Sequence, residues 1–474
     1  MQVEQIYTGC LAHGAYYLES NGEVAIIDPL REIQPYIKMA EQRGAKIKYI
    51  FETHFHADFV SGHVDLAKAT GATIVYGPTQ MKTGFDMLVG TDGQEFKLGK
   101  ATIKLLHTPG HTMESSCYLL INEEGKEEAI FTGDTLFIGD VGRPDLAQHV
   151  IADLTQEKLA NHLYDSLQNK ILPLANDIIV YPGHGAGSAC GKNLSKETSD
   201  TLGNQKKNNY ALREGITREE FVKELLTGLT APPSYFPKNV LMNIQGYESV
   251  DSVVSRATTA IPVNQFEAII NETDVVLIDT RDASEFGKGF IPGAINIGIT
   301  GSFAVWVGTL IKDIKQRIVF VAEPGREEEV AIRLARVGYD NCQGYLQGGM
   351  PPWRDANYAV DTIPMVSVEE FAAEEAKNPA INILDVRKKS EYDSEHIINA
   401  INAPLDYVDE SMLQVDKHKT YYVHCAGGYR SMVFASILKA KGYNNLINVN
   451  GGFSAIKKSE KFKITDYVCP TTIL

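Results

Sequence analysis

A short stretch near the end of the first 60 residues holds three side chains that are able to bind one metal ion. It reads His-x-His-x-Asp-Phe, with His54, His56, Asp58 and then Phe59. The apolar run at residues 47–51 predicts a strand that ends just before the first histidine. A sharp turn after such a strand lets two imidazoles and a carboxylate converge on one point. Because Phe59 offers no ligand atom, the stretch favours one metal rather than two.

Three later turns repeat the arrangement of a short strand, a glycine and a possible ligand. They are Thr108-Pro-Gly-His-Thr112, Phe131-Thr-Gly-Asp-Thr135 and Tyr181-Pro-Gly-His-Gly185. A single histidine in such a turn is more often a surface or hydrogen-bonded residue. Four turns in this order are improbable by chance, since strand ends that carry polar turns are where a sheet gathers its functional side chains. We therefore expect His111, Asp134 and His184 at the same site.

These patterns, H-x-H-x-D, P-G-H-T, G-D and G-H-G, together resemble the metallo-β-lactamase superfamily over roughly the first half of the chain. The sequence Gly-Arg-Pro-Asp at residues 142–145 is similar to the persulfide dioxygenase branch of that superfamily. The resemblance implies an αββα sandwich and one Fe(II) per chain, with zinc as the alternative. It places the metal on His54, His111 and Asp134. Two imidazoles and one carboxylate suit an Fe(II) that keeps open positions for O₂ and a sulfur ligand.

The resemblance leaves His56, Asp58 and His184 to orient the ligands and bound water through hydrogen bonds. The alternative is that they hold a second metal, as in the neighbouring glyoxalase II branch, and the missing ligand at Phe59 argues against it. Arg143 and Asp145 are expected at the substrate entrance, where an arginine pairs with a carboxylate or phosphate of the thiol carrier. The alternative for these two residues is a pair that only fixes a loop.

A second chemical motif lies near the C-terminus, in the loop from Cys425 to Ser431. An apolar strand precedes it and a helix follows. Gly427 and Gly428 let the backbone curl so that N–H groups point at the sulfur, and the helix N-terminus adds positive potential. Such surroundings lower the pKa of a thiol and stabilise a persulfide anion. Arg430 is expected to close this cradle, which makes Cys425 the candidate nucleophile.

The second half of the chain contains an internal repeat. The box Asp-x-Arg-x-x-x-Glu-aromatic occurs at residues 279–286 and 385–392, and each copy continues with a strand, a helix and Gly-Gly. Alternating strands and helices predict a parallel sheet with helices on both faces. The repeats resemble rhodanese domains, and four residues between Cys425 and Arg430 match the sulfurtransferase loop length.

The first copy has no cysteine in its loop, Val321–Arg326, and Glu323 there would repel a sulfur anion. We expect this copy to be inactive in sulfur transfer and to serve packing or docking. The aspartates and arginines that open each box are expected to form structural pairs near the sheet edge. The remaining cysteines are expected to be inert, with a passive tail position for the last one (Cys10, Cys117, Cys190, Cys342 and Cys469).

Bulk properties bound these hypotheses. A length of 474 residues with 44% hydrophobic residues indicates about three α/β domains, which we place at residues 1–245, 255–360 and 366–474. The net charge of -15 opposes nonspecific nucleic-acid binding. Scattered cysteines indicate a reducing compartment. Neither a signal peptide nor an apolar run long enough for a membrane is expected, so the cytoplasm is the default. The superfamily resemblance also implies a homo-oligomer.

The strand and helix predictions for the first domain rest on short apolar runs and periodicity. Strands are expected at residues 23–28, 72–76, 101–106, 129–131 and 177–181, and helices at residues 33–42 and 152–167.

Together the motifs predict an enzyme that oxidises a low-molecular-weight thiol persulfide with O₂ to sulfite. Cys425 would then transfer sulfane sulfur to sulfite and make thiosulfate. Two alternatives stay open: a glyoxalase II-like zinc thioester hydrolase with a sulfurtransferase domain, and a sulfur carrier that hands the Cys425 persulfide to a protein partner. The carrier thiol is open among glutathione, coenzyme A, bacillithiol and a protein thiol.

Overall fold

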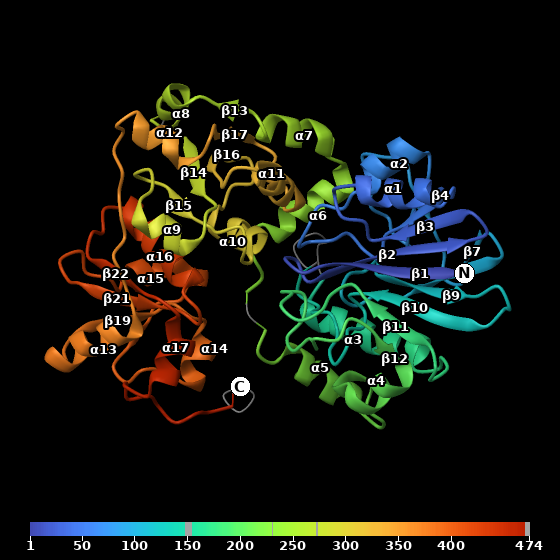
Figure 1. The fold of residues 1–474 in the computed structure, drawn as a ribbon. Coiled ribbons are helices and arrows are strands. Elements are labelled where there is room, and N and C mark those ends of the chain that lie inside the picture. Colours follow the sequence, from blue (N-terminus) through green and yellow to red (C-terminus); the bar gives the residue numbers. More distant parts are fainter. Residues whose placement is uncertain (147–153, 230, 272–273, 470–474) are drawn as a thin grey trace. The chain divides into compact units, whose positions relative to one another are not determined.

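The computed structural model describes residues 1–146, 154–229, 231–271 and 274–469. The described chain divides into two compact units (Figure 1). The first runs from Met1 to Ser252 and also takes in Ala335–Gly338, and the second takes the rest from Val253 onward. The bounds of the three predicted domains stay a prediction.

The first unit is built on two mixed sheets among the residues described. One has the order β1 (Gln2–Thr8), β2 (His13–Ser20), β3 (Glu23–Ile27), β4 (Lys46–Phe51), β5 (Thr73–Tyr76) and β6 (Leu88–Val89). The other has the order β12 (Asp200–Thr201), β11 (Ile179–Pro182), β10 (Glu127–Gly133), β9 (Ser116–Ile121), β8 (Ala101–His107) and β7 (Glu95–Leu98). In the first sheet β3, β4 and β5 are parallel, and in the second β10 and β11 are parallel.

The two sheets pack face to face. Their shared core takes Ile27 and Phe51 from the first sheet and Ile103, Tyr118 and Phe131 from the second. Side chains alternate between the faces of a strand, so β9 sends Tyr118 into this core while its neighbours point the other way. The second sheet is therefore buried on both faces.

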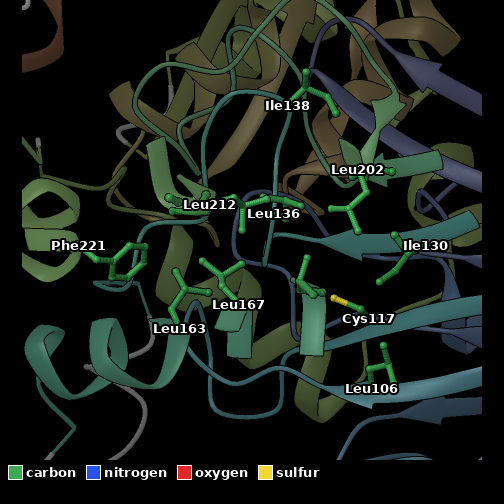
Figure 2. Packing of buried hydrophobic residues seen from close by; sticks show 14 of the residues in the cluster. Leu106, Cys117, Ile130, Leu136, Ile138, Leu163, Leu167, Leu202, Leu212 and Phe221 are labelled. Atoms are coloured by element: carbon green, nitrogen blue, oxygen red, sulfur yellow. The ribbon is translucent and has the colours of Figure 1, made fainter. Parts of the chain in front are cut away.

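Helices cover the outer face of the second sheet (Figure 2). Cys117 and Leu119 of β9 pack there with Leu163, Leu167 and Phe221. Leu163 belongs to α3 (Gln156–Ser166), Leu167 to the π-helical turn η1 (Leu167–Ile171) and Phe221 to α5 (Arg218–Leu226). The other helices of the unit are α1 (Gln34–Gln42), α2 (His63–Thr70), α4 (Leu202–Asn208), the 3₁₀ turn η2 (Tyr210–Leu212), α6 (Phe236–Gln245) and the border helix α7 (Val250–Ala257). Sheets inside and helices outside make the αββα sandwich that was expected.

The second unit contains two α/β copies, each with its own sheet, and the two sheets have the same strand topology. The first copy comprises β13 (Ala260–Ile261), α8 (Val263–Ile270), β14 (Val275–Asp279), α9 (Ala283–Lys288), β15 (Ile295–Asn296), α10 (Phe303–Leu310), β16 (Arg317–Val321), α11 (Glu327–Arg336), β17 (Cys342–Leu346) and α12 (Met350–Asp355). Its strand order is β13-β17-β16-β14-β15, and all these pairings are parallel.

The second copy comprises β18 (Met365–Val366), α13 (Val368–Lys377), β19 (Asn382–Asp385), α14 (Lys389–Ser394), β20 (Ile401–Asn402), the 3₁₀ turn η3 (Leu405–Tyr407), α15 (Val408–Met412), β21 (Tyr421–His424), α16 (Tyr429–Ala440), β22 (Leu446–Val449) and α17 (Gly452–Ser459). The order β18-β22-β21-β19-β20 reproduces that of the first copy, again with parallel pairings. The predicted α/β class and the repeat are therefore confirmed.

The predicted strands of the first unit correspond to β3, β5, β8, β10 and β11, and the helix at residues 33–42 corresponds to α1. The other predicted helix is α3 from Gln156 on, while residues 152–153 lie outside the described residues. Among the described residues, the helices are too short or too polar to span a bilayer.

Candidate functional site

Turns at the carboxyl ends of both sheets bring three predicted metal ligands together. His54 follows β4, His111 follows β8 and Asp134 follows β10. One potential ligand atom of each residue lies within 4.8 Å of those of the other two, and all three side chains are buried. The Nε2 atoms of His54 and His111 are 3.9 and 3.4 Å from Asp134 Oδ2. The structure therefore brings these three residues together, and their role as metal ligands stays a prediction.

Hydrogen bonds fix which nitrogen of each imidazole faces the group. Thr53 Oγ1 donates to Asp28 Oδ2 at 2.8 Å, so it accepts from His54 Nδ1 at 3.0 Å. His111 Nδ1 donates to the carbonyl oxygen of Arg143 at 2.8 Å. With both Nδ1 atoms protonated, each Nε2 presents a lone pair toward Asp134.

The charge state of the group also suits a bound cation. Burial holds the pKa of His54 well below its ordinary value and lowers the pKa of His111 to about 4. Burial likewise holds the pKa of Asp134 well above its usual range, and both of its carboxylate oxygens lack a hydrogen-bond partner. Two neutral imidazoles and an unpartnered carboxylate fit a divalent metal, whose charge compensates the buried anion.

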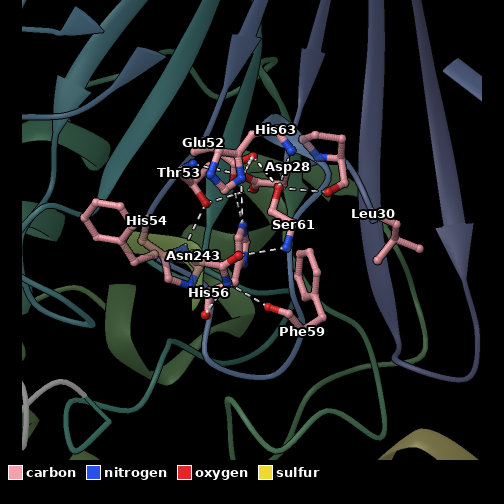
Figure 3. Close-up of polar contacts among 12 residues, drawn as sticks. Asp28, Leu30, Glu52, Thr53, His54, His56, Phe59, Ser61, His63 and Asn243 are labelled. Carbon is pink, nitrogen blue, oxygen red and sulfur yellow. Dashed lines mark hydrogen bonds and ion pairs between the residues drawn. The ribbon is translucent and has the colours of Figure 1, made fainter. Parts of the chain in front are cut away.

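His56 turns away from this group toward two buried carboxylates (Figure 3). Its Nε2 lies 3.1 Å from Asp28 Oδ1 and 3.4 Å from Glu52 Oε2. Glu52 in turn accepts a hydrogen bond from Ser61 Oγ at 2.5 Å. Asp28 thus contacts both histidines of the motif, directly at His56 and through the threonine at His54.

Helix α6 holds the backbone of this loop. Asn243 Nδ2 donates to the carbonyl oxygens of His56 and Phe59, at 2.8 Å each, and its Oδ1 accepts from Ser61 N at 2.9 Å (Figure 3). The ring of Phe59 is buried and packs against His13 and His56, with ring centroids 4.3 Å apart in both pairs. The aromatic ring fills the space beside the histidines with carbon instead of a ligand atom.

His184 and Asp58 form a second group beside Asp134. His184 Nε2 lies 3.4 Å from Asp58 Oδ2 and 3.7 Å from Asp134 Oδ1, while its Nδ1 contacts the Ala12 carbonyl oxygen at 3.3 Å. Burial raises the pKa of Asp58 to about 6 and lowers that of His184 to about 4. The predicted second-metal alternative needs His56, Asp58 and His184 at one point, but His56 lies in the other group.

Cys190 joins Asp58 and His184 instead, with its sulfur within 4.8 Å of a ligand atom of each. The expectation that Cys190 is inert did not include this proximity. Burial, with the nearby Asp58 and Asp134 carboxylates, holds the pKa of Cys190 well above its usual range, so the group is a thiol rather than a thiolate. Its position six residues after His184 was the available signal.

Arg143 and Asp145 pair with each other in the interior. Arg143 Nε and Nη2 each donate to a carboxylate oxygen of Asp145 at 2.5 Å, and Nη1 donates to the carbonyl oxygen of Ala189. Since the carbonyl of Arg143 accepts from His111, this bidentate pair orients a predicted metal ligand. The contacts favour the loop-fixing alternative, and a role in substrate binding stays a prediction.

The cysteine loop of the second unit has the predicted curled form. Cys425 is buried directly after β21, and Gly428 N donates to its sulfur at 3.0 Å. Gly428 has φ +103, a conformation that other residues rarely adopt. Ser431 Oγ lies 3.6 Å from the same sulfur. Gly427 leaves open space where a Cβ would stand.

Arg430 reaches across the loop to α14, where its Nη1 and Nη2 donate to the Glu391 carboxylate at 2.6 and 2.9 Å. Glu391 belongs to the repeated box, and its contact with Arg430 was not foreseen. The aspartates of the two boxes pair with the arginines two residues on, as predicted: Arg281 Nη2 to Asp279 Oδ2 and Arg387 Nη2 to Asp385 Oδ2, at 2.5 Å each.

The chain is similar to known proteins of two families. Residues 8–184 match the model of the metallo-beta-lactamase superfamily, and residues 262–356 and 367–459 each match the rhodanese-like domain. A hydroxyacylglutathione hydrolase of Pelagibacter ubique is 32% identical over 37% of this chain and 68% of its own length. The cytoplasmic hydroxyacylglutathione hydrolase of Arabidopsis thaliana is 32% identical over 37% of this chain, which covers 65% of that relative, just under two thirds. A metallo-beta-lactamase structure from Staphylococcus aureus matches 73% of this chain and 98% of its own, with 30% identity and a TM-score of 0.64.

The chain belongs to the metallo-beta-lactamase superfamily.

The superfamily domain is joined to two rhodanese-like domains, as the repeat predicted. In this metallo-beta-lactamase superfamily member the site lies at the carboxyl ends of strands from both sheets, and its chemistry comes from the turns that follow β4, β8, β10 and β11. The identity of the metal and the roles of the individual site residues stay predictions.

Proposed function

We propose that the first unit is an Fe(II) persulfide dioxygenase and that Cys425 is a sulfurtransferase nucleophile. The first reaction is R-S-SH with O₂ and water giving R-SH, sulfite and two protons. In the second, the Cys425 thiolate attacks the outer sulfur of another persulfide and the thiol R-SH leaves. Sulfite then attacks the sulfur held by Cys425, the Cys-S–S bond breaks, and thiosulfate forms.

The observation that carries the dioxygenase proposal is the composition of the buried group. Two neutral imidazoles and one carboxylate converge there, and Phe59 packs on His56 without offering a ligand atom. Ferrous iron held by His54, His111 and Asp134 would supply a redox-active Lewis acid with open positions for O₂ and a persulfide sulfur. The Cys425 loop in the same chain supports sulfane sulfur as the shared substrate chemistry.

Residues around the group have defined tasks in this reaction. Thr53 and the Arg143 carbonyl keep the His54 and His111 lone pairs directed at the metal position. His184 stays neutral because burial lowers its pKa to about 4, so with its proton on Nδ1 its Nε2 is able to accept a proton from water. Asp58 beside it is placed to hold that proton, since burial raises its pKa to about 6.

A second candidate function is a zinc thioester hydrolase of the hydroxyacylglutathione hydrolase kind. The relatives of that name at 32% identity favour it, as does the group formed by Asp58, His184 and Cys190. Phe59 argues against it, because the ring removes a ligand position next to Asp58.

Metal-dependent turnover separates the two functions. The metal-free chain is loaded anaerobically with Fe(II) or Zn(II) and mixed with glutathione persulfide or with a glutathione thioester. The dioxygenase proposal predicts O₂ uptake and sulfite formation by the iron-loaded protein alone. Thioester hydrolysis by the zinc-loaded protein, without O₂ uptake by either form, would establish the second candidate.

A third candidate is the sulfur carrier, in which Cys425 hands its sulfur to a protein partner. The buried position of Cys425 gives this candidate less support than a small acceptor such as sulfite. Transfer to sulfite by the purified chain, with no partner present, would exclude an obligatory protein acceptor.

A further inference from the structure

The rhodanese-like domain that has no cysteine in its loop contacts the Cys425–Ser431 loop of its neighbour, here called the sulfur loop. Helix α16, which begins at the end of the Cys425 loop, packs on β15 and α9 of the first copy. β15 is the edge strand of its sheet. The outward N–H of Asn296 on this strand donates to Ser436 Oγ of α16 at 2.9 Å, in the interior. An edge-strand donor that would otherwise be unpaired is thus satisfied by the other copy.

Tyr429 belongs to the sulfur loop and makes a direct contact with the first copy. It lies between Gly428, whose N–H donates to the Cys425 sulfur, and Arg430. Its Oη donates to the carbonyl oxygen of Gly298 in the first copy at 2.9 Å. Burial raises the pKa of Tyr429, so the phenol keeps the proton that this hydrogen bond needs.

The receiving segment is shaped for the ring. A Cβ at Gly301 would stand 2.4 Å from Tyr429 Cε2, and a Cβ at Gly298 would stand 3.3 Å from the same atom. The segment is held from within its own copy by Arg333 of α11, whose Nη1 donates to the Ile299 carbonyl oxygen. The first copy therefore contacts Tyr429 of the sulfur loop with a segment that contains two glycines and is held in place by Arg333.

We propose that the rhodanese-like domain that has no cysteine in its loop positions the sulfur loop through Tyr429, so that the two rhodanese-like domains act as one sulfurtransferase. Anchoring Tyr429 fixes the start of α16 and with it the direction of the Gly428 N–H toward Cys425. Arg430, the next residue, is placed against Glu391 by the same anchor. Tyr429 is thus a positioning residue. The inference rests on the proposed sulfur transfer at Cys425 and adds a role for the copy that lacks the nucleophile.

The test uses the full chain with one change on each side of the contact. Tyr429→Phe removes the hydroxyl alone, and Gly301→Ala pushes on the ring from the first copy. Tyr443→Phe, just after α16 and with its ring near Lys417, is the matched control. The pH dependence of iodoacetamide modification is followed by mass spectrometry on the peptide that carries Cys425, together with kcat and KM for transfer from glutathione persulfide to sulfite.

Loss of the anchor should slow iodoacetamide modification of Cys425 across the pH range tested and lower kcat about three- to tenfold, the effect of one hydrogen bond, with little change in KM. Both variants should do this with unchanged O₂ uptake, while the control behaves as the unmodified chain. Wild-type pH profiles and kcat values in both Tyr429→Phe and a folded Gly301→Ala chain would overturn the inference. If Gly301→Ala does not fold, Tyr429→Phe decides alone. The alkylation profile needs no turnover, so absent transfer in the unmodified chain would contradict the proposed function and leave the positioning test intact.

Discussion

At the residue scale, the proposed metal site at His54, His111 and Asp134 depends on partners that set which atoms face one another. His54 and His111 could each bind through either nitrogen. Thr53 and the Arg143 carbonyl leave Nε2 as the free nitrogen, because each accepts a hydrogen bond from the protonated Nδ1 of its histidine. The hydrogen-bonded neighbours are therefore as much a part of the site as the ligands.

Replacing a proposed ligand should remove the metal. In the His111→Gln chain we expect iron content after anaerobic loading and dialysis to fall by about 100-fold or more, since loss of a ligand exceeds the 10- to 100-fold effect of an outer partner. O₂ uptake should fall with it. His162→Gln is the matched control, because His162 is exposed on α3. Retention of iron by His111→Gln at the level of the control would contradict the assignment.

Removing the hydrogen-bond partner of His54 should weaken the site without removing a ligand. Thr53→Val keeps the shape but loses the acceptor for His54 Nδ1, so we expect about tenfold weaker iron retention. Thr53→Ser restores the hydroxyl and should recover most of it. Iron titration with a competing chelator measures both variants, and equal affinity in Thr53→Val and the unmodified chain would show that Thr53 does not orient His54.

Much of the site could be predicted from residues alone, because each ligand candidate stands in a glycine turn or directly after a strand. What could not be predicted is which partner each side chain takes. His56 is the second histidine of the motif, but its side chain contacts Asp28, which precedes it by 28 residues in the sequence. Cys190 likewise lies beside Asp58, which is far from it in the sequence. The pairing of Arg430 with Glu391 likewise depends on how α14 packs. Such contacts come from tertiary packing, for which spacing gives no direct signal.

At the element scale, the turns that carry the candidate ligands are held in position because helices and strands pack closely behind them. Gly110 has φ +152, and a Cβ there would stand 2.4 Å from the Leu163 Cα on α3. The helix thus packs directly on the turn that carries His111. Ser166 Oγ, at the end of α3, donates to the Pro109 carbonyl oxygen at 2.7 Å and holds the same turn.

Gly110→Ala should therefore destabilise the first unit and displace His111. The cost expected for inserting a methyl group against backbone is about 1–3 kcal/mol, measured as a fall in the denaturation midpoint. Iron retention should fall in parallel. Gly9→Ala meets nothing within 4 Å and serves as the control. A Gly110→Ala chain as stable as the control would mean that α3 moves away at little cost.

The elements that periodicity found and missed have a physical reason. The predicted strands gave clear apolar runs between turns (β3, β5, β8, β10 and β11). β9, Ser116–Ile121, was not predicted, because it is buried on both faces and shows no alternation. β1, Gln2–Thr8, was missed since its polar residues leave only a weak apolar pattern. The repeat made the second unit easier, since one box supported the other.

At the scale of the whole molecule, the proposed function joins an oxidation that makes sulfite to a transfer that uses it. Both proposed reactions draw on the same persulfide, and a covalent link raises the effective concentration of one site's product for the other. The two rhodanese-like domains share one compact unit, in which the copy without a loop cysteine contacts the loop that carries Cys425. Under the proposed function, separate products come from separate sites.

The most direct test of that division is the product balance of the Cys425→Ser chain, loaded with iron and supplied with glutathione persulfide and O₂. O₂ uptake, sulfite and thiosulfate are measured together. The unmodified chain should form one thiosulfate for each O₂ consumed. The Cys425→Ser chain should consume O₂ at an unchanged rate and release one sulfite for each O₂, with no enzymatic thiosulfate. Thiosulfate formation at the full rate without Cys425, or persulfide turnover without O₂ uptake, would contradict the account.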